Sequence, residues 1–190
     1  GEALAIDVAS IGPDSAEAVL LIVSGTHGVE GYTGSALQHH WLDHHLGDRP
    51  DDVRVVLLHA FNPYGFSWVR RVNEDNVDLN RNFLDHASPH PENADYDGLA
   101  DALNPTVLDE GTIAASLAAV QRFQQEHGAT AAYRALSGGQ YGHPQGVQYG
   151  GREPVWSNRT LRAVWAEHAA EAEVTAFLDL HSGLGPRGVG

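Results

Sequence analysis

Three short, mostly apolar runs divide the chain, and each has the length of a strand rather than of a helix. Apolar runs without polar alternation are typical of strands that are covered on both faces, as in parallel sheets. A looser alternation over Glu2–Ile11 predicts an edge strand. The buried strands are predicted at Ala18–Val23, Val53–Phe61 and Val174–Leu180.

Between the strands, apolar residues recur at the three- and four-residue spacing of amphipathic helices. Because strands and helices alternate, the sequence predicts an α/β fold with a mixed, mostly parallel sheet flanked by helices. A helix is predicted over Thr112–His127, where Ile113, Leu117, Val120 and Phe123 lie on one face. The other helices are predicted over Ser35–Leu46, over Ala129–Leu136, and from Ser157 as N-cap to about Glu171.

Two polar segments lack a clear period. Asn62–Phe83 reads NPYGFSWVRRVNEDNVDLNRNF and places aromatic residues between asparagines and arginines. Long irregular segments inside a compact domain are usually functional or disordered, and the aromatic content argues against disorder. We therefore expect an ordered loop with short helical turns. Leu84–Asp109, which is acidic and contains prolines, is expected to be a surface insertion.

Composition narrows the class of protein. The 190 residues suit a single domain, which we expect to cover residues 1–190. The net charge of −14 argues against nucleic acid or an anionic membrane as a partner. No apolar stretch approaches the roughly 20 residues that cross a bilayer, and a cytoplasmic location is the default expectation. The chain opens without methionine and stops soon after its last predicted strand, so we expect a fragment that is incomplete at both ends and lacks C-terminal strands.

Polar side chains follow the first and the last buried strand. His27 and Glu30 come directly after the first, and His181 comes directly after the last. The carboxyl ends of parallel strands meet at one edge of a sheet, where α/β folds place their sites. Since the chain has no cysteine, a metal must take His, Asp or Glu, and two histidines with one carboxylate suit zinc with an open position for water. The sequence therefore predicts a hydrolytic zinc site.

Four segments, SGTHGVEG, NPYGFSWVRR, DNVDLNRNF and FLDLHSG, resemble motifs of the zinc carboxypeptidase superfamily. Within it, the chain resembles the branch that holds succinylglutamate desuccinylase and aspartoacylase, and more closely a bacterial group of uncharacterised carboxypeptidase-like proteins. The resemblance runs from about Val19 to Ser182. It implies a zinc carboxypeptidase-like fold and a metallopeptidase or deacylase. Such a hydrolase uses zinc-activated water to cleave an amide bond in an acylated amino acid or a peptide C-terminus.

The resemblance also implies roles for the metal-binding residues. His27, Glu30 and His181 would be the zinc ligands, and Asp78 would orient a ligand histidine. The general base of the family is a glutamate on a strand downstream of the third ligand, and no glutamate of this chain takes that role by motif. The alternative is therefore a non-catalytic zinc- and ligand-binding relative.

Substrate contacts follow from the same resemblance. Asn80 and Arg81 would hold the carboxylate of a small-molecule or peptide substrate, for which the guanidinium fork is well shaped. Arg71 would stabilise the oxyanion that forms at the scissile carbonyl. Arg70 is the alternative candidate for this role, because the sequence does not fix which of the two neighbouring arginines in this loop faces the site.

Other motifs favour simpler interpretations. The G-x-S-x-G turn of serine hydrolases is absent, although Ser24 and Ser182 lie near histidines. A coincidental set of motifs on a structural α/β module is a third hypothesis, which stoichiometric metal in the purified protein would contradict. A further histidine cluster has metal-binding spacing but lies on the polar side of a predicted helix, and we interpret it as a solvated face: His39, His40, His44 and His45.

Overall fold

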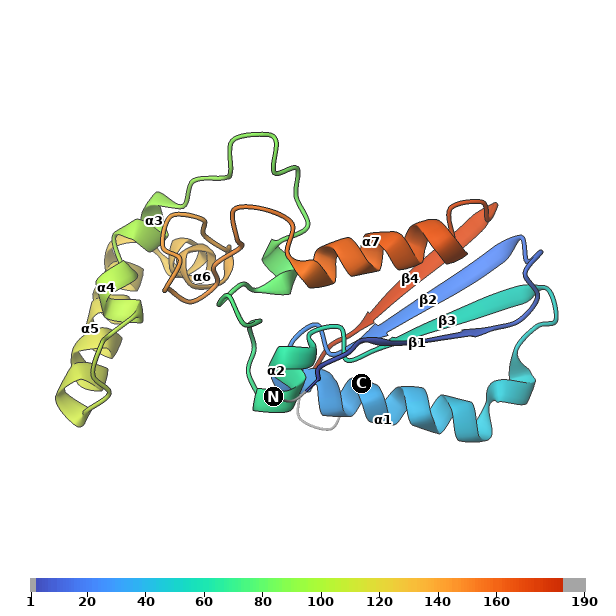
Figure 1. Ribbon diagram of the computed structural model, residues 1–190. Coiled ribbons are helices and arrows are strands. Elements are labelled where there is room, and N and C mark those ends of the chain that lie inside the picture. Colours follow the sequence, from blue (N-terminus) through green and yellow to red (C-terminus); the bar gives the residue numbers. More distant parts are fainter. Residues whose placement is uncertain (1–2, 183–190) are drawn as a thin grey trace. The chain divides into compact units, whose positions relative to one another are not determined.

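A computed structural model describes residues 3–182 of the chain. The chain divides into two compact units (Figure 1). The first unit comprises Gly1–Glu74 and Trp156–Gly190, and the second comprises Asp75–Val155. The second unit is thus an insertion in the sequence of the first. The single catalytic domain expected over residues 1–190 stays a prediction.

The first unit contains a four-stranded sheet with the strand order β1-β3-β2-β4. β2 is parallel to both of its neighbours, whereas β1 pairs with β3 in the antiparallel direction. This arrangement confirms the predicted α/β class, the mostly parallel sheet and the N-terminal edge strand. The strands span Asp7–Ile11 (β1), Ala18–Ser24 (β2), Val53–His59 (β3) and Val174–Leu180 (β4).

The core of this unit lies on the two central strands. Leu21 and Val23 of β2 and Val56 and Leu58 of β3 are fully buried, as apolar runs in a parallel sheet should be. β4 was expected to be equally buried, and that expectation is wrong: Phe177 remains 47% exposed. β4 forms an edge of the four-stranded sheet, and an apolar run does not reveal whether its strand is central or lateral.

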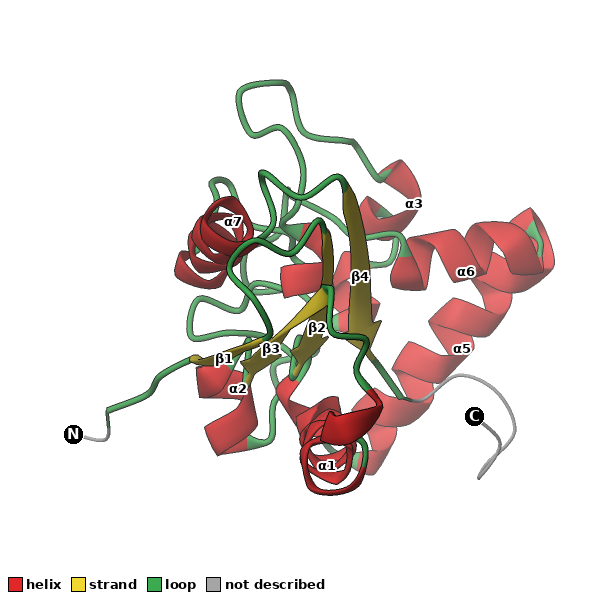
Figure 2. Ribbon diagram, turned by 90° about the vertical axis from the view of Figure 1, so that its right-hand side faces the viewer, coloured by secondary structure: helices red, strands yellow, loops and turns green. Residues whose placement is uncertain are grey.

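Two helices cover opposite faces of the sheet (Figures 1 and 2). They are α1 (Gly28–His44), followed by the 3-10 turn η1 (Leu46–Asp48), and α7 (Trp156–His168). The predicted N-cap of α7 is wrong, because Ser157 lies within the helix and is buried.

α1 begins at Gly28, well before the predicted start at Ser35. Its buried face is built from glycines rather than from large apolar residues, so hydrophobic periodicity did not reveal it. A Cβ added at Gly28 would overlap the backbone of Gly65, and one added at Gly34 would lie 2.8 Å from the Cβ of Ser24. The glycines therefore allow α1 to lie directly against its neighbours.

The polar segment after β3 contains the short helical turns that its sequence predicts. The first is α2 (Pro63–Trp68), which Asn62 caps by accepting a hydrogen bond from the backbone N–H of Gly65 at 2.8 Å. The second is the 3-10 turn η2 (Leu79–Arg81), which lies in the second unit.

The second unit is helical. Tyr96 and Leu99 are buried within the segment that we expected to be a surface insertion, so this segment contributes core residues instead. α5 has no buried residue, and Leu117 on its apolar face is 59% exposed. Ile113 and Leu117 line an open apolar groove shared with residues of α4 and α6. The helices are α3 (Ala94–Asp97), α4 (Ala100–Leu103), α5 (Glu110–His127) and α6 (Ala129–Ser137).

No helix in residues 3–182 has the length and apolar character needed to cross a membrane.

Candidate metal centre

The candidate site forms at the carboxyl ends of β2 and β4, which are parallel neighbours. Their register places Ser24 beside Leu180, so the residues that follow the two strands emerge side by side. His27 and His181 lie in these following segments, and their ring centroids are 5.1 Å apart at an interplanar angle of 68°. The fold thus brings together two histidines that are far apart in the sequence.

The carboxylate comes from the first turn of α1. His27 is the N-cap residue of this helix, and the backbone N–H of Glu30 donates a hydrogen bond to its carbonyl oxygen at 3.0 Å. A carboxylate in the first helical turn interacts favourably with the helix dipole. His27, Glu30 and His181 each direct one ligand atom into a common space, with all three atoms within 4.8 Å of one another.

Within residues 3–182, this is the one group of three metal-ligating side chains with such spacing. Two imidazole nitrogens and one carboxylate oxygen match the donor set that zinc takes in hydrolytic sites. His27 is almost fully buried, while the side chains of Glu30 and His181 retain 17% and 32% of their exposure. The group therefore has a buried side and a side open to solvent, as a site for an exchangeable water requires.

Asp179 was not predicted as a site residue. Its carboxylate accepts a hydrogen bond from Nε2 of His181 at 2.7 Å and another from the hydroxyl of Thr26 at 2.8 Å. The bond from His181 raises the pKa of that histidine, and burial opposes this effect. Alternate residues of a strand share a face, so the Asp-x-His spacing in FLDLHSG was the signal that could have identified it.

Glu30 has two further contacts. The backbone N–H of Ser182 donates to its carboxylate, and Nη1 of Arg71 lies 3.9 Å from Oε1. Of the two candidate arginines, Arg71 is therefore the one that the structure brings beside the ligand group. The side chain of Arg70 is exposed. Its backbone N–H donates a hydrogen bond to the carbonyl oxygen of Gly65 at 2.8 Å, at the end of α2.

The other predicted site residues lie in the second unit, around η2. Asp78 is fully buried and accepts a hydrogen bond from the backbone N–H of Asn80 at 3.0 Å. The guanidinium of Arg81 donates to the backbone carbonyls of Asn80 and Ser137. These contacts order the DLNR turn. The roles of Asp78 toward a ligand histidine, and of Asn80 and Arg81 toward a substrate, stay predictions.

The histidine cluster on α1 has a different geometry. The ring centroids of His40 and His44 lie 4.7 Å apart with the rings tilted by 55°, and those of His40 and His45 lie 5.4 Å apart. His45 pairs with Asp48 at 2.9 Å. These residues are exposed and do not form a group of three converging ligand atoms. A solvated face remains the interpretation of this cluster.

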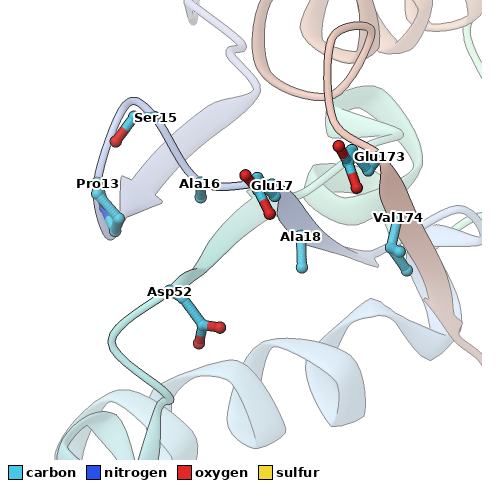
Figure 3. A pocket seen from close by; sticks show the side chains of 8 residues that line it. All are labelled: Pro13, Ser15, Ala16, Glu17, Ala18, Asp52, Glu173 and Val174. Carbon is cyan, nitrogen blue, oxygen red and sulfur yellow. The ribbon is translucent and has the colours of Figure 1, made fainter.

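A cavity of about 440 Å³ lies at the opposite end of the sheet, at the amino-terminal ends of β2, β3 and β4 (Figure 3). It is lined by the β1–β2 turn and by residues next to the starts of β2, β3 and β4, including the acidic Glu17, Asp52 and Glu173. Because the candidate ligands lie at the carboxyl ends of β2 and β4, this cavity is not part of the candidate metal centre.

Fold and site together define an α/β protein with a His–Glu–His group at the carboxyl ends of parallel strands. A family model described as a protein of unknown function (DUF2817) matches residues 1–190, and the chain belongs to this family. Searches of curated proteins and of solved structures found no match.

Proposed function

We propose that the protein is a zinc-dependent hydrolase that cleaves an amide bond in a carboxylate-bearing substrate, either an acylated amino acid or a peptide C-terminus. The observation that carries this proposal is the convergence of His27, Glu30 and His181, whose ligand atoms lie within 4.8 Å of one another. The order and residue types of the four motifs, which resemble those of zinc carboxypeptidases, support the same reaction class.

The donor set fits zinc, and His27, Glu30 and His181 would hold the ion. When bound in such a site, zinc polarises a carbonyl oxygen and lowers the pKa of water, which is the chemistry of hydrolysis. The exposure of Glu30 and His181 leaves room for water and substrate on one side of the group.

Arg71 would act on the scissile carbonyl. Its guanidinium lies 3.9 Å from Glu30 and keeps 39% of its exposure, so it can also face a substrate. A fixed positive charge at this point stabilises the negative charge that develops on the carbonyl oxygen during attack. Asn80 and Arg81 would bind the substrate carboxylate, with Arg81 offering the planar fork that matches a carboxylate.

Metal content is the first test of this proposal. Elemental analysis of the wild type should find about one zinc per chain, and His27→Ala should lose it because one of three ligands is removed. His40→Ala/His44→Ala is the matched control, since it removes histidines from the same helix that do not join the ligand group. Wild-type protein without metal, or equal loss in the control, would contradict the proposal.

A hydrolysis screen on N-acyl amino acids and short peptides then separates the two functional hypotheses. Product formation that depends on zinc and on His27 supports the hydrolase. Tight binding of zinc and of a carboxylate ligand without product supports the non-catalytic binding protein, which is the alternative that the unassigned general base leaves open.

A further inference from the structure

Asp179 connects the two segments that carry the histidines. It lies near the end of β4, opposite Val23 of β2. One carboxylate oxygen accepts from the hydroxyl of Thr26 at 2.8 Å, and the other pairs with Nε2 of His181 at 2.7 Å. Thr26 is almost fully buried and directly precedes His27, so this single carboxylate joins segments that are 153 positions apart in the chain.

The contact defines which nitrogen of His181 carries a proton. An ionised carboxylate only accepts hydrogen bonds, so Nε2 must be the protonated nitrogen that donates to Asp179. In the neutral ring, Nδ1 then holds the free lone pair. That atom lies 4.0 Å from Oε2 of Glu30, on the side of the ring where the candidate ligand atoms converge.

Asp179 does not belong to the ligand group itself. The three converging residues are His27, Glu30 and His181, and Asp179 contacts the opposite nitrogen of the imidazole. A carboxylate in this position holds the ring orientation and raises the basicity of the ligand nitrogen. Thr26 holds the carboxylate in turn, because its hydroxyl occupies the second oxygen.

We propose that Asp179 is a positioning residue that, anchored by Thr26, holds His181 in its Nε2–H tautomer and presents Nδ1 as a metal ligand. The tautomer part stands on the geometry of the chain alone, and the metal part rests on the proposed zinc-dependent function.

The experiment compares wild type with Asp179→Ala and uses two measurements. The first is the nitrogen-15 and N–H proton NMR spectrum of His181 in metal-free protein, recorded over a pH series and interpreted where the ring nitrogen shifts no longer change with rising pH. The second is zinc affinity, measured by competition with a chelating dye. Asp48→Ala is the matched control, because it removes another Asp–His pair of the first unit, the contact with His45 at 2.9 Å.

Wild-type His181 should show a protonated Nε2 with a slowly exchanging N–H proton and an unprotonated Nδ1. Asp179→Ala should lose that proton signal, since nothing then protects it from exchange with solvent. Zinc should bind about 10–100-fold more weakly, the loss typical of an outer partner of a ligand histidine. Asp48→Ala should match wild type in both measurements.

A wild-type spectrum with the proton on Nδ1, or an unchanged N–H signal in Asp179→Ala, would overturn the proposal. If Asp179→Ala does not fold, Thr26→Val is the variant that tests the proposal. It should weaken zinc binding by a smaller factor, because Asp179 keeps its hydrogen bond to His181. An unchanged zinc affinity in Thr26→Val would count against the proposal. Failure of the wild type to bind zinc would instead refute the proposed zinc-dependent hydrolase. The NMR spectrum of the metal-free protein would still test whether Asp179 holds the Nε2–H tautomer of His181.

Discussion

At the scale of single residues, the candidate metal centre depends on where each side chain leaves the backbone. His27 leaves the loop just before α1, Glu30 leaves the first turn of that helix, and His181 follows β4. Strand order and chain direction made the convergence of these three residues predictable, because apolar runs revealed the strands. Asp179 was not predictable in the same way, since a polar residue in a strand is usually on a solvated face, and its contact to Thr26 depends on a register that the sequence does not disclose.

The two neighbouring arginines should differ sharply in activity measurements. Arg71→Ala removes a charge beside Glu30, and we expect kcat/KM for an N-acyl amino acid to fall by about 10²–10³-fold, the usual effect of losing one oxyanion contact. Arg70→Ala removes an exposed side chain and should change kcat/KM little. Zinc content, measured alongside, should stay near one per chain in both variants. Equal kcat/KM values in the two variants would show that Arg71 has no role in the reaction.

The acid sensitivity of the fold should depend on His59. Burial lowers the pKa of this histidine below its usual value, so the folded protein favours the neutral imidazole. Its contribution to stability is fully present above about pH 6.5 and is lost as the pH falls through the folded pKa. The free energy of unfolding, measured by urea titration at a series of pH values, should therefore fall less steeply below about pH 6.5 in His59→Gln than in wild type. The raised pKa of His181 acts in the opposite direction, but it is present in both proteins and cancels in the comparison.

At the scale of elements, the apolar pattern predicted the existence of the strands and helices better than their limits. The start of α1 was not predicted, because the buried residues of its first turns are Gly28, Gly31 and Gly34, and glycine contributes nothing to a hydrophobic pattern. The exposure of β4 was not predicted, because an apolar run identifies a strand without identifying what covers it.

The glycine face of α1 leads to a stability prediction with an internal control. A methyl group added at Gly28 would overlap the backbone of Gly65 in α2, so Gly28→Ala should destabilise the fold by about 1–3 kcal/mol. A methyl group added at Gly47, in the η1 turn, would meet no atom within 4 Å, so Gly47→Ala should be neutral or stabilising by about 0.5 kcal/mol. Denaturant unfolding of both variants checks this, and equal midpoints would show that α1 and α2 can separate without cost.

At the scale of the whole molecule, the chain divides the predicted site residues between its two compact units. The ligand group and Arg71 belong to the first unit, whereas Asp78, Asn80 and Arg81 belong to the second. The sequence predicted these residues by motif and order, but it did not predict that a compact helical unit would be inserted between β3 and β4.

Zinc should stabilise the folded chain through this site. A ligand that binds only the folded state at one hundred times its Kd adds about 2.7 kcal/mol. We therefore expect the Tm of wild type to rise on adding zinc and to fall back with EDTA, with no such change in His27→Ala. Calorimetry with the His40→Ala/His44→Ala variant as control separates this effect from zinc held by the exposed histidines of α1. An equal rise in wild type and His27→Ala would place the stabilising zinc elsewhere.

The order of the strands along the chain also affects how the protein is made. β2 is synthesised early, but its partner β4 follows only after the whole second unit. At about 5–20 residues per second, the edge of β2 that pairs with β4 stays unpaired for roughly 8–30 seconds of synthesis. An apolar strand with an unpaired edge is a template for wrong pairing during this interval. The nascent chain therefore passes through a vulnerable stage in which His27 and Glu30 are already present, and a complete ligand group arises only when translation has delivered His181.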